Sequence, residues 1–143
     1  LNRPDATAQT IVDGWLRTGD IGYVDADNFI FLVDRAKEMV LRGGENVFCS
    51  EVETALYKHP GVAECSVFSV PDERLGEEVG AAIYPAAGAR PSAAELREFC
   101  KTQLAAYKAP RYIWILDEPL PRNASGKFVK RALQDSLDIA AAG

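Results

Sequence analysis

The residues VAECSVFSV at positions 62–70 and VGAAIY at positions 79–84 decide the architecture of this chain. Both runs are short and consist mainly of apolar residues, including β-branched and aromatic ones, which is typical of strands. Pro71 and Asp72 follow the first run and mark the start of a loop. A third apolar run at residues 112–116 predicts another strand. We therefore expect a small β-sheet.

Helices are predicted on both sides of these strands in the sequence. Residues 50–53 read Ser-Glu-Val-Glu and residues 92–95 read Ser-Ala-Ala-Glu. Both are capping boxes, in which a hydroxyl and a carboxylate satisfy free backbone amides at a helix start. The first helix ends before Pro60, the second places apolar residues at spacings of three and four, and residues 128–137 predict a third helix. The order of elements predicts an α+β fold in which helices pack on a small sheet.

Ahead of this sheet, residues 15–33 predict a β-ribbon, with a turn at residues 25–28. Residues 1–14 are polar and contain turn signals. A single ribbon is too small to be stable alone, so we expect a partner elsewhere in the protein. The chain begins with Leu1 and its only methionine is Met39, which indicates a fragment of a longer protein.

Composition excludes several classes of function. The 143 residues carry a net charge of −5, which argues against binding to nucleic acid. No apolar run approaches the length of a membrane span. Cys49, Cys65 and Cys100 are odd in number and lack CxxC spacing, so we expect them reduced in the core of a cytoplasmic protein. His59 is the only histidine, which excludes a histidine-based triad, and no metal site is expected.

Four short motifs point to a particular chemistry. The run PRNASGK at residues 121–127 places Lys127 on a turn made flexible by Gly126, just before a predicted helix. The others are TGD at residues 18–20, DRAK at residues 34–37 and GGEN at residues 43–46. Together they resemble the carboxy-terminal motifs of the acyl-adenylate-forming (AMP-binding) enzymes, most closely the fatty-acyl-CoA ligases, also called acyl-CoA synthetases.

The resemblance implies a ligation in two steps. A carboxylic acid substrate, expected to be a fatty acid, attacks the α-phosphate of ATP and forms an acyl-adenylate with release of pyrophosphate. The thiol of CoA then attacks the acyl carbonyl and expels AMP. By resemblance Lys127 is the catalytic lysine of the first step, where a cation stabilises the charge that gathers around phosphorus. Read from the residues alone, Lys127 is a solvated loop cation.

The resemblance also assigns nucleotide contacts. Asp20 matches the aspartate that accepts hydrogen bonds from the ribose hydroxyls, and Arg35 matches an arginine that contacts the nucleotide. The alternatives are a turn residue for Asp20, and for Arg35 an ion pair with Asp34 or Glu38. Lys37 matches the hinge about which the carboxy-terminal domain rotates; alternatively it is an exposed charged residue.

Contacts with CoA are implied for two further segments. Gly43 and Gly44 match the loop that lines the pantetheine tunnel, although a tight turn would use the same glycines. Tyr107 matches an aromatic residue that stacks on the CoA adenine, and Arg111 or Lys108 would meet the 3′-phosphate. The acidic loop at residues 71–78 also matches the family, and we interpret it as structural, with its glutamates on a solvated face.

The resemblance divides the chain into two parts. Residues 1–36 would end a large amino-terminal domain that is otherwise missing, and residues 37–143 would form the mobile carboxy-terminal lid. That domain would be the lid's partner and would hold the Mg²⁺ that arrives with ATP, so this fragment is expected to be inactive alone. An aryl-acid ligase or a peptide-synthetase adenylation domain would share these motifs. A non-catalytic nucleotide-binding or interaction module is the remaining alternative.

Overall fold

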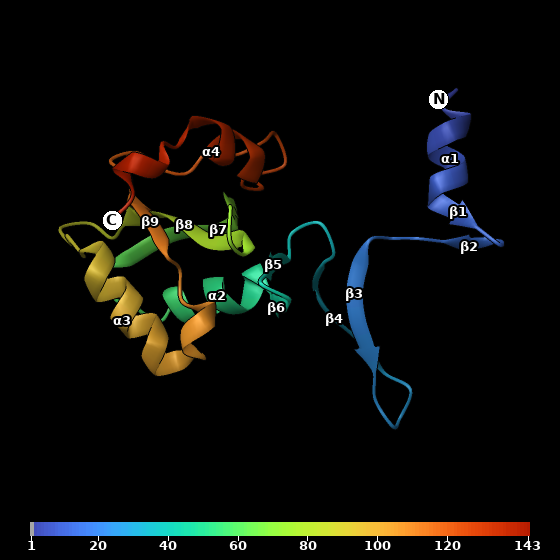
Figure 1. Ribbon diagram of the computed structural model, residues 1–143, viewed down its shortest axis with the longest axis horizontal. Helices are drawn as coiled ribbons and strands as arrows, with labels where there is room; N and C mark the ends of the chain where they lie inside the picture. Colours follow the sequence, from blue (N-terminus) through green and yellow to red (C-terminus); the bar gives the residue numbers. More distant parts are fainter. Residues whose placement is uncertain (1) are drawn as a thin grey trace. The chain divides into compact units, whose positions relative to one another are not determined.

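The computed structural model describes residues 2–143 of the chain, which fall into two compact units divided between Lys37 and Glu38 (Figure 1). The first unit contains helix α1 (Pro4–Thr10), the short strands β1 (Ile11–Val12) and β2 (Trp15–Leu16), and the hairpin of β3 (Asp20–Val24) and β4 (Ile30–Arg35). Strands β3 and β4 are antiparallel. No side chain among residues 2–37 is buried, so this unit has no core of its own.

The hairpin β3–β4 confirms the predicted ribbon, and residues 25–28 form its turn. The carboxylate of Asp25 accepts hydrogen bonds from the backbone N–H groups of Asp27 and Phe29, both at 2.9 Å. Sequence analysis missed α1, because polar residues and turn signals dominate residues 1–14. Pro4 begins this helix, where proline is tolerated because the first helical N–H has no intrahelical partner.

The second unit is built on a five-stranded sheet. Its strands are β5 (Val40–Arg42), β6 (Glu45–Val47), β7 (Val62–Asp72), β8 (Gly76–Pro85) and β9 (Tyr112–Ile115). Strands β7 and β8 form a long antiparallel hairpin. On the other edge of β8, β5 pairs at Gly76 and β9 runs parallel from Gly80 to Ile83. The predicted strands are therefore confirmed, and the β5–β6 hairpin is an addition that sequence analysis did not identify.

The helices and short 3-10 segments of this unit lie between and after the strands in the sequence. They are α2 (Cys49–Leu56), α3 (Ala93–Gln103), the 3-10 helix η1 (Ala106–Lys108), α4 (Lys130–Ser136) and the 3-10 helix η2 (Ile139–Ala141). The fold is α+β, as predicted.

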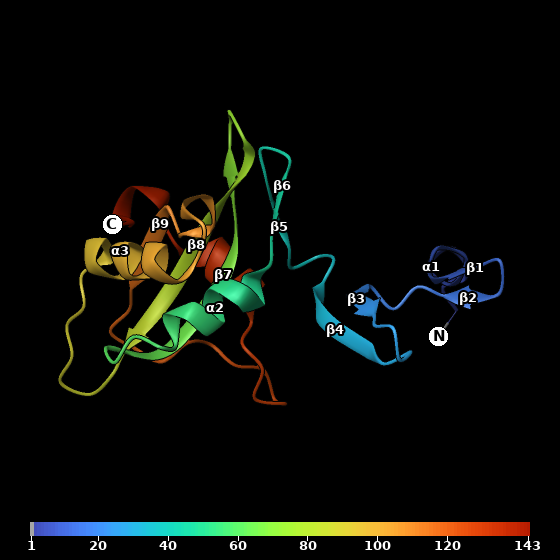
Figure 2. The ribbon, with the colours of Figure 1, turned by 90° about the horizontal axis from the view of Figure 1, so that it is seen from below.

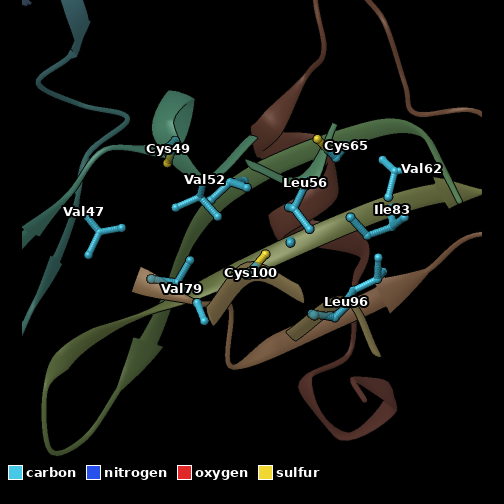
Figure 3. Packing of buried hydrophobic residues seen from close by; sticks show 14 of the residues in the cluster. Val47, Cys49, Val52, Leu56, Val62, Cys65, Val79, Ile83, Leu96 and Cys100 are labelled. Carbon is cyan, nitrogen blue, oxygen red and sulfur yellow. The ribbon is translucent and has the colours of Figure 1, made fainter. Parts of the chain in front are cut away.

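Both faces of the sheet are covered. One core cluster joins Val52 and Leu56 of α2 and Leu96 of α3 to Cys65 and Ile83 of the sheet (Figure 3). The opposite cluster joins α4 to β7 and β9 and contains Phe68, Val70, Ala82, Trp114, Leu120 and Leu133. Because side chains alternate between the two faces of β7, those on one face pack into the first cluster and those on the other face into the second. This explains why residues 62–70 form a nearly continuous apolar run.

The two predicted capping boxes have different outcomes. At α3, Ser92 Oγ accepts from the Glu95 backbone N–H at 3.1 Å and Glu95 accepts from the Ser92 N–H at 3.4 Å, which confirms the box. At α2 the prediction is wrong, because the helix already begins at Cys49 and Ser50 lies in its first turn. The Glu53 carboxylate instead accepts a hydrogen bond from the backbone N–H of Val67 in β7, at 2.8 Å.

Candidate functional site

Residues 121–127, here named the lysine loop, form a tight turn before α4. The side chain of Asn123 accepts hydrogen bonds from the backbone N–H groups of Ser125 and Lys127, at 2.9 and 3.0 Å. The Gly126 N–H donates to the Asn123 carbonyl, and Gly126 has φ of +78°, a conformation that favours glycine. Lys127 is exposed at the end of this turn. The loop therefore presents the Lys127 ammonium group on a hydrogen-bonded turn.

The base of the lysine loop is attached to β7 through Glu64. One carboxylate oxygen of Glu64 accepts from the Leu120 backbone N–H at 2.9 Å, and the other lies 2.8 Å from Arg122 Nη2. Arg122 also donates from Nη1 to the Gly126 carbonyl at 2.8 Å, and its guanidinium lies 4.2 Å from the Phe128 ring centroid. The Arg122 side chain beside Glu64 holds the pKa of this carboxyl below its ordinary value.

Asp20 and Arg35, the two predicted nucleotide contacts, are brought together in the first unit. They are directly opposite each other in the β3–β4 register, and Arg35 Nε lies 3.3 Å from Asp20 Oδ1. Arg35 therefore forms an ion pair, as its predicted alternative role required, but the acid is Asp20 and not Asp34 or Glu38. Asp34 accepts a hydrogen bond from the Arg35 backbone N–H instead. Asp20 and Arg35 are far apart in the sequence and meet only because β3 pairs with β4. Local sequence patterns could therefore not predict this ion pair.

Gly43 and Gly44, here named the glycine loop, form the turn between β5 and β6. Their φ angles are +56° and +91°, which favour glycine at both positions. The Gly43 N–H donates to the Leu75 carbonyl at 2.9 Å. A Cβ atom on Gly43 would lie 2.9 Å from Leu75 Cδ2. The glycine loop is therefore packed against the turn that joins β7 and β8.

Two acidic residues that were predicted to be solvated hold the glycine loop. Glu78 is 1% exposed, and its Oε1 lies 2.7 Å from Arg42 Nη2. This contact is an ion pair rather than a well-directed hydrogen bond. Glu77 accepts from the Leu41 backbone N–H at 2.7 Å. The prediction of a solvated face at residues 71–78 is wrong for Glu78, because the start of β8 lies against β5.

The predicted CoA contacts lie in different environments. Tyr107 is partly buried and packs against the first core cluster. Lys108 Nζ is bound by both carboxylate oxygens of Glu51, at 2.7 and 2.8 Å. Arg111 is exposed, with its guanidinium 5.5 Å from the Tyr112 ring centroid. Of the two cations predicted to meet the CoA phosphate, Arg111 is thus the more accessible.

The lysine loop and the glycine loop are attached to opposite ends of the β7–β8 hairpin. Glu64 lies near the start of β7, whereas Gly43 contacts Leu75 in the turn after Asp72. At about 3.3 Å per residue, β7 separates Glu64 from Asp72 by roughly 26 Å. Figure 2 shows the β5–β6 hairpin beside the tip of β7–β8 and the orange-red segment before α4 at the other end of this unit.

Lys130 links the start of the second unit to its helices. Its Nζ lies 3.3 Å from Glu38 and 3.0 Å from Glu53 of α2. Burial alone would lower the pKa of Lys130, but the neighbouring Cys49 and Glu53, with Glu38, outweigh it and raise the pKa. Lys37, the predicted hinge, is exposed and is the last residue of the first unit.

The three cysteines are free and buried, as predicted. Burial raises the pKa of Cys65 to about 12 and that of Cys100 to about 11, so both thiols are protonated at neutral pH. Within residues 2–143, no group of three or more His, Cys, Asp or Glu side chains could hold a metal ion. None of the described helices has the length and apolarity needed to cross a membrane.

Residues 51–127 match the family of AMP-binding enzyme C-terminal domains, and the chain belongs to this family. It is 50% identical over 133 residues to a fatty acid–[acyl-carrier-protein] ligase, ScoC, from Streptomyces coeruleorubidus. The aligned residues cover 92% of this chain and 25% of that protein. It is 47% identical over 132 residues to a 2-succinylbenzoate–CoA ligase from Geobacillus kaustophilus, covering 92% of this chain and 27% of the relative.

A solved structure shows the same fold. The o-succinylbenzoate CoA synthetase of Bacillus subtilis, in complex with an acyl-adenylate intermediate, superposes with a TM-score of 0.84 at 40% identity. The match covers 95% of this chain and 28% of that one. The chain thus spans about a quarter of the length of the curated relatives it matches.

Proposed function

We propose that this chain is the carboxy-terminal part of an ATP-dependent acid–CoA ligase, which activates a carboxylic acid as acyl-AMP and transfers the acyl group to CoA. The observation that supports this proposal best is the placement of Lys127 and the glycine loop at opposite ends of one hairpin. Both groups would act at the same acyl-phosphate position, one in each half-reaction. A lid that turns between two orientations would present each in its own step.

In the first half-reaction Lys127 acts by electrostatics. The acid carboxylate attacks the α-phosphorus of ATP, and the bond to the pyrophosphate oxygen breaks. Negative charge from two anions gathers around phosphorus, and the ammonium group of Lys127 stabilises it. A unit charge about 4 Å from a phosphate oxygen contributes roughly 4 kcal/mol at an effective dielectric of about 20. A lysine suits this role because its charge is compact and its stem is flexible.

Asp20 and Arg35 are proposed to bind the nucleotide. Arg35 lies beside Asp20, and the Asp20 carboxylate oxygens can accept hydrogen bonds from the ribose hydroxyls. Arg35 remains largely exposed, with 66% of its side chain accessible, and can also reach a phosphate oxygen. The described residues offer no cluster of metal ligands, so we assign no Mg²⁺ contact to this chain.

In the second half-reaction the lid turns about Lys37, which ends the first unit. Lys127 withdraws, and the glycine loop comes to the acyl-adenylate, where its bare backbone can line the path of the pantetheine arm. The CoA thiolate then attacks the acyl carbon and AMP leaves. A rigid residue at the hinge would hinder this turn, so Lys37→Pro should slow the full cycle in the ligase. Unchanged turnover by that variant would reject the hinge.

The partner of the first unit is proposed to be the ligase's own amino-terminal domain. Large apolar side chains of this unit are exposed, among them Trp15 at 80%, Ile30 at 73% and Leu32 at 72%. Apolar surface of this kind is normally covered by another part of a protein. The adenylate site would form where that domain meets the lid.

The acid is proposed to be a fatty acid, with an aryl acid as the second candidate. A relative named as a fatty acid ligase supports the first, and relatives that act on succinylbenzoate support the second. The experiment is pyrophosphate release by the ligase that contains this chain, with acids from acetate to long-chain fatty acids and aryl acids.

Replacing Lys127 with Ala should slow this release about 10²–10³-fold with the preferred acid. Thioester formation from supplied acyl-adenylate should be spared. Equal loss of both half-reactions would reject the role of Lys127. Absence of release with every acid, from folded protein that binds ATP, would favour a non-catalytic nucleotide-binding module.

The acceptor is proposed to be CoA, and a carrier protein is the alternative because one relative is named as an acyl-carrier-protein ligase. A substitution at Arg111 distinguishes between CoA and a carrier protein as the acceptor. If Arg111 binds the 3′-phosphate, Arg111→Ala should raise KM for CoA about tenfold and leave KM for dephospho-CoA unchanged. A preference for carrier-bound phosphopantetheine, with no effect of Arg111→Ala on CoA, would favour the carrier protein.

A further inference from the structure

The β7–β8 hairpin holds two carboxylate–arginine pairs that the proposed mechanism does not use. Glu64, near the start of β7, binds Arg122 of the lysine loop at 2.8 Å. Glu78, near the start of β8, lies 2.7 Å from Arg42, the residue just before the glycine loop. Each pair joins one end of the hairpin to one functional loop. Neither arginine belongs to the groups proposed to touch substrate.

The Glu64–Arg122 pair controls the backbone beside Lys127. Arg122 uses separate nitrogens for Glu64 and for the Gly126 carbonyl, so it bridges the strand and the peptide that precedes Lys127. The second carboxylate oxygen of Glu64 accepts a hydrogen bond from the Leu120 backbone N–H, at the start of the loop. A planar guanidinium can make these bonds at fixed angles, whereas an ammonium group cannot. The turn is therefore fixed at both its entrance and its tip.

The Glu78–Arg42 pair lies directly before the glycine loop and holds the strand from which this loop starts. Arg42 is the last residue of β5, and its Cα pairs with Gly76 in the sheet. Glu78 is buried, so its charge needs a partner, and Arg42 supplies one. The Gly43 N–H then reaches the Leu75 carbonyl. Loss of the pair would free the end of β5 and the turn that follows it.

We propose that Glu64 with Arg122, and Glu78 with Arg42, are separate positioning pairs for the two half-reactions, the first for adenylation and the second for thioester formation. This inference rests on the proposed function of the two loops. It goes further because it divides residues of one hairpin between two chemical steps. A displacement of about 1 Å at a reacting group costs on the order of 10²-fold in rate, so loose loops should slow their own step.

The test measures both half-reactions in the ligase that contains this chain. Adenylation is followed as pyrophosphate release without thiol, and thioester formation is started from supplied acyl-adenylate and CoA. Glu64→Gln and Arg122→Ala should slow adenylation about 10–100-fold and change thioester formation less than about threefold. Glu78→Gln and Arg42→Met should show the reverse selectivity.

Matched controls come from the same region. Arg131→Ala removes an exposed arginine of α4 that lies 3.8 Å from Asp135, and Glu73→Gln removes an exposed carboxylate of the β7–β8 turn. Both controls should leave both rates unchanged. Arg122→Lys keeps the charge near Lys127 but loses the two-nitrogen bridge, so the loss in adenylation should persist. Full activity of Arg122→Lys would show that the charge alone matters, and would overturn the positioning role.

Glu78→Gln leaves Arg42 without its partner and could unfold the lid. The double variant Arg42→Met/Glu78→Leu removes both charges with similar volume and retains an apolar contact. If that variant is folded, thioester formation should still be slowed selectively. Unchanged rates in folded variants, or equal loss of both half-reactions, would overturn the inference. If wild type adenylates an acid and Lys127→Ala does not, these results leave the proposed function intact.

Discussion

The lysine loop and the glycine loop are both held by an arginine paired with a glutamate of the β7–β8 hairpin, but solvent reaches the two pairs to different extents. The side chains of Arg122 and Glu64 are 46% and 21% exposed, whereas those of Arg42 and Glu78 are 25% and 1% exposed. An exposed pair is weak and easily exchanged with water. A buried pair resists disruption, because a lone charge would remain in the interior.

This difference suits the proposed tasks of the two loops. Lys127 has to enter the adenylation site and leave it with the lid, so its turn and the Glu64–Arg122 pair lie at the surface, where water reaches them. The glycine loop has to line a narrow path with its backbone, which favours a shape that is fixed before the ligand arrives. The comparison therefore predicts that equivalent changes at the two ends have unequal effects on stability.

The largest expected difference is between Glu78→Gln and Glu64→Gln. Glu78→Gln should lower the free energy of unfolding by about 2–3 kcal/mol, because Arg42 keeps its charge in a largely buried position. Glu64→Gln should cost less than about 1 kcal/mol. Urea unfolding of the chain, followed by fluorescence of the buried Trp114, measures both values. Equal costs, with Glu73→Gln neutral as the control, would contradict the comparison.

A smaller difference is expected between alanine substitutions at Gly43 and Gly126. Both glycines have positive φ, so alanine costs about 1–2 kcal/mol of backbone strain at each. Only at Gly43 would the added methyl group also meet Leu75, at 2.9 Å from Cδ2. Gly43→Ala should therefore be the more destabilising of the two in the same unfolding experiment. The reverse order would mean that Leu75 moves freely and that the glycine loop is not closely packed.

The smallest effect is the pH dependence of the Glu64–Arg122 pair. The folded pKa of Glu64 lies below its ordinary value of 4.5, so the pair contributes stability that is fully present above pH 4.5. This contribution is lost as the pH falls through the lower, folded pKa. The stability difference between wild type and Glu64→Gln should therefore shrink as the pH falls below 4.5. A difference that stays constant as the pH falls below 4.5 would show that hydrogen bonding, not charge, holds the loop.

Local patterns in the sequence were sufficient for the main elements of the lid. The apolar runs of β7, β8 and β9 and the capping box at Ser92 were confirmed, because each depends on neighbours in the chain. The capping box at Ser50 failed for a tertiary reason. The Glu53 carboxylate that would have completed it is bound by β7, and Phe48, not Ser50, is the N-cap residue of α2.

The contacts of the candidate site could be predicted less well. Motifs singled out Lys127, Asp20, Arg35 and the glycine loop, and their roles remain proposals. Nothing in the sequence indicated that Arg35 would face Asp20, or that Glu64 would hold Arg122. In each case the partners are far apart in the chain, and register or packing brings them together. Glu78 was missed for the same reason, since a run of acids normally predicts a solvated surface.

The sequence by itself determined the family, the α+β class and the turns that need glycine, because these follow from spacing, local propensity and backbone sterics. Only the tertiary structure decided which charges meet and which are buried. It joined the lysine loop to one end of the β7–β8 hairpin and the glycine loop to the other. The physical reason is that ion pairs and burial depend on distances through space, which the order of residues along the chain does not specify.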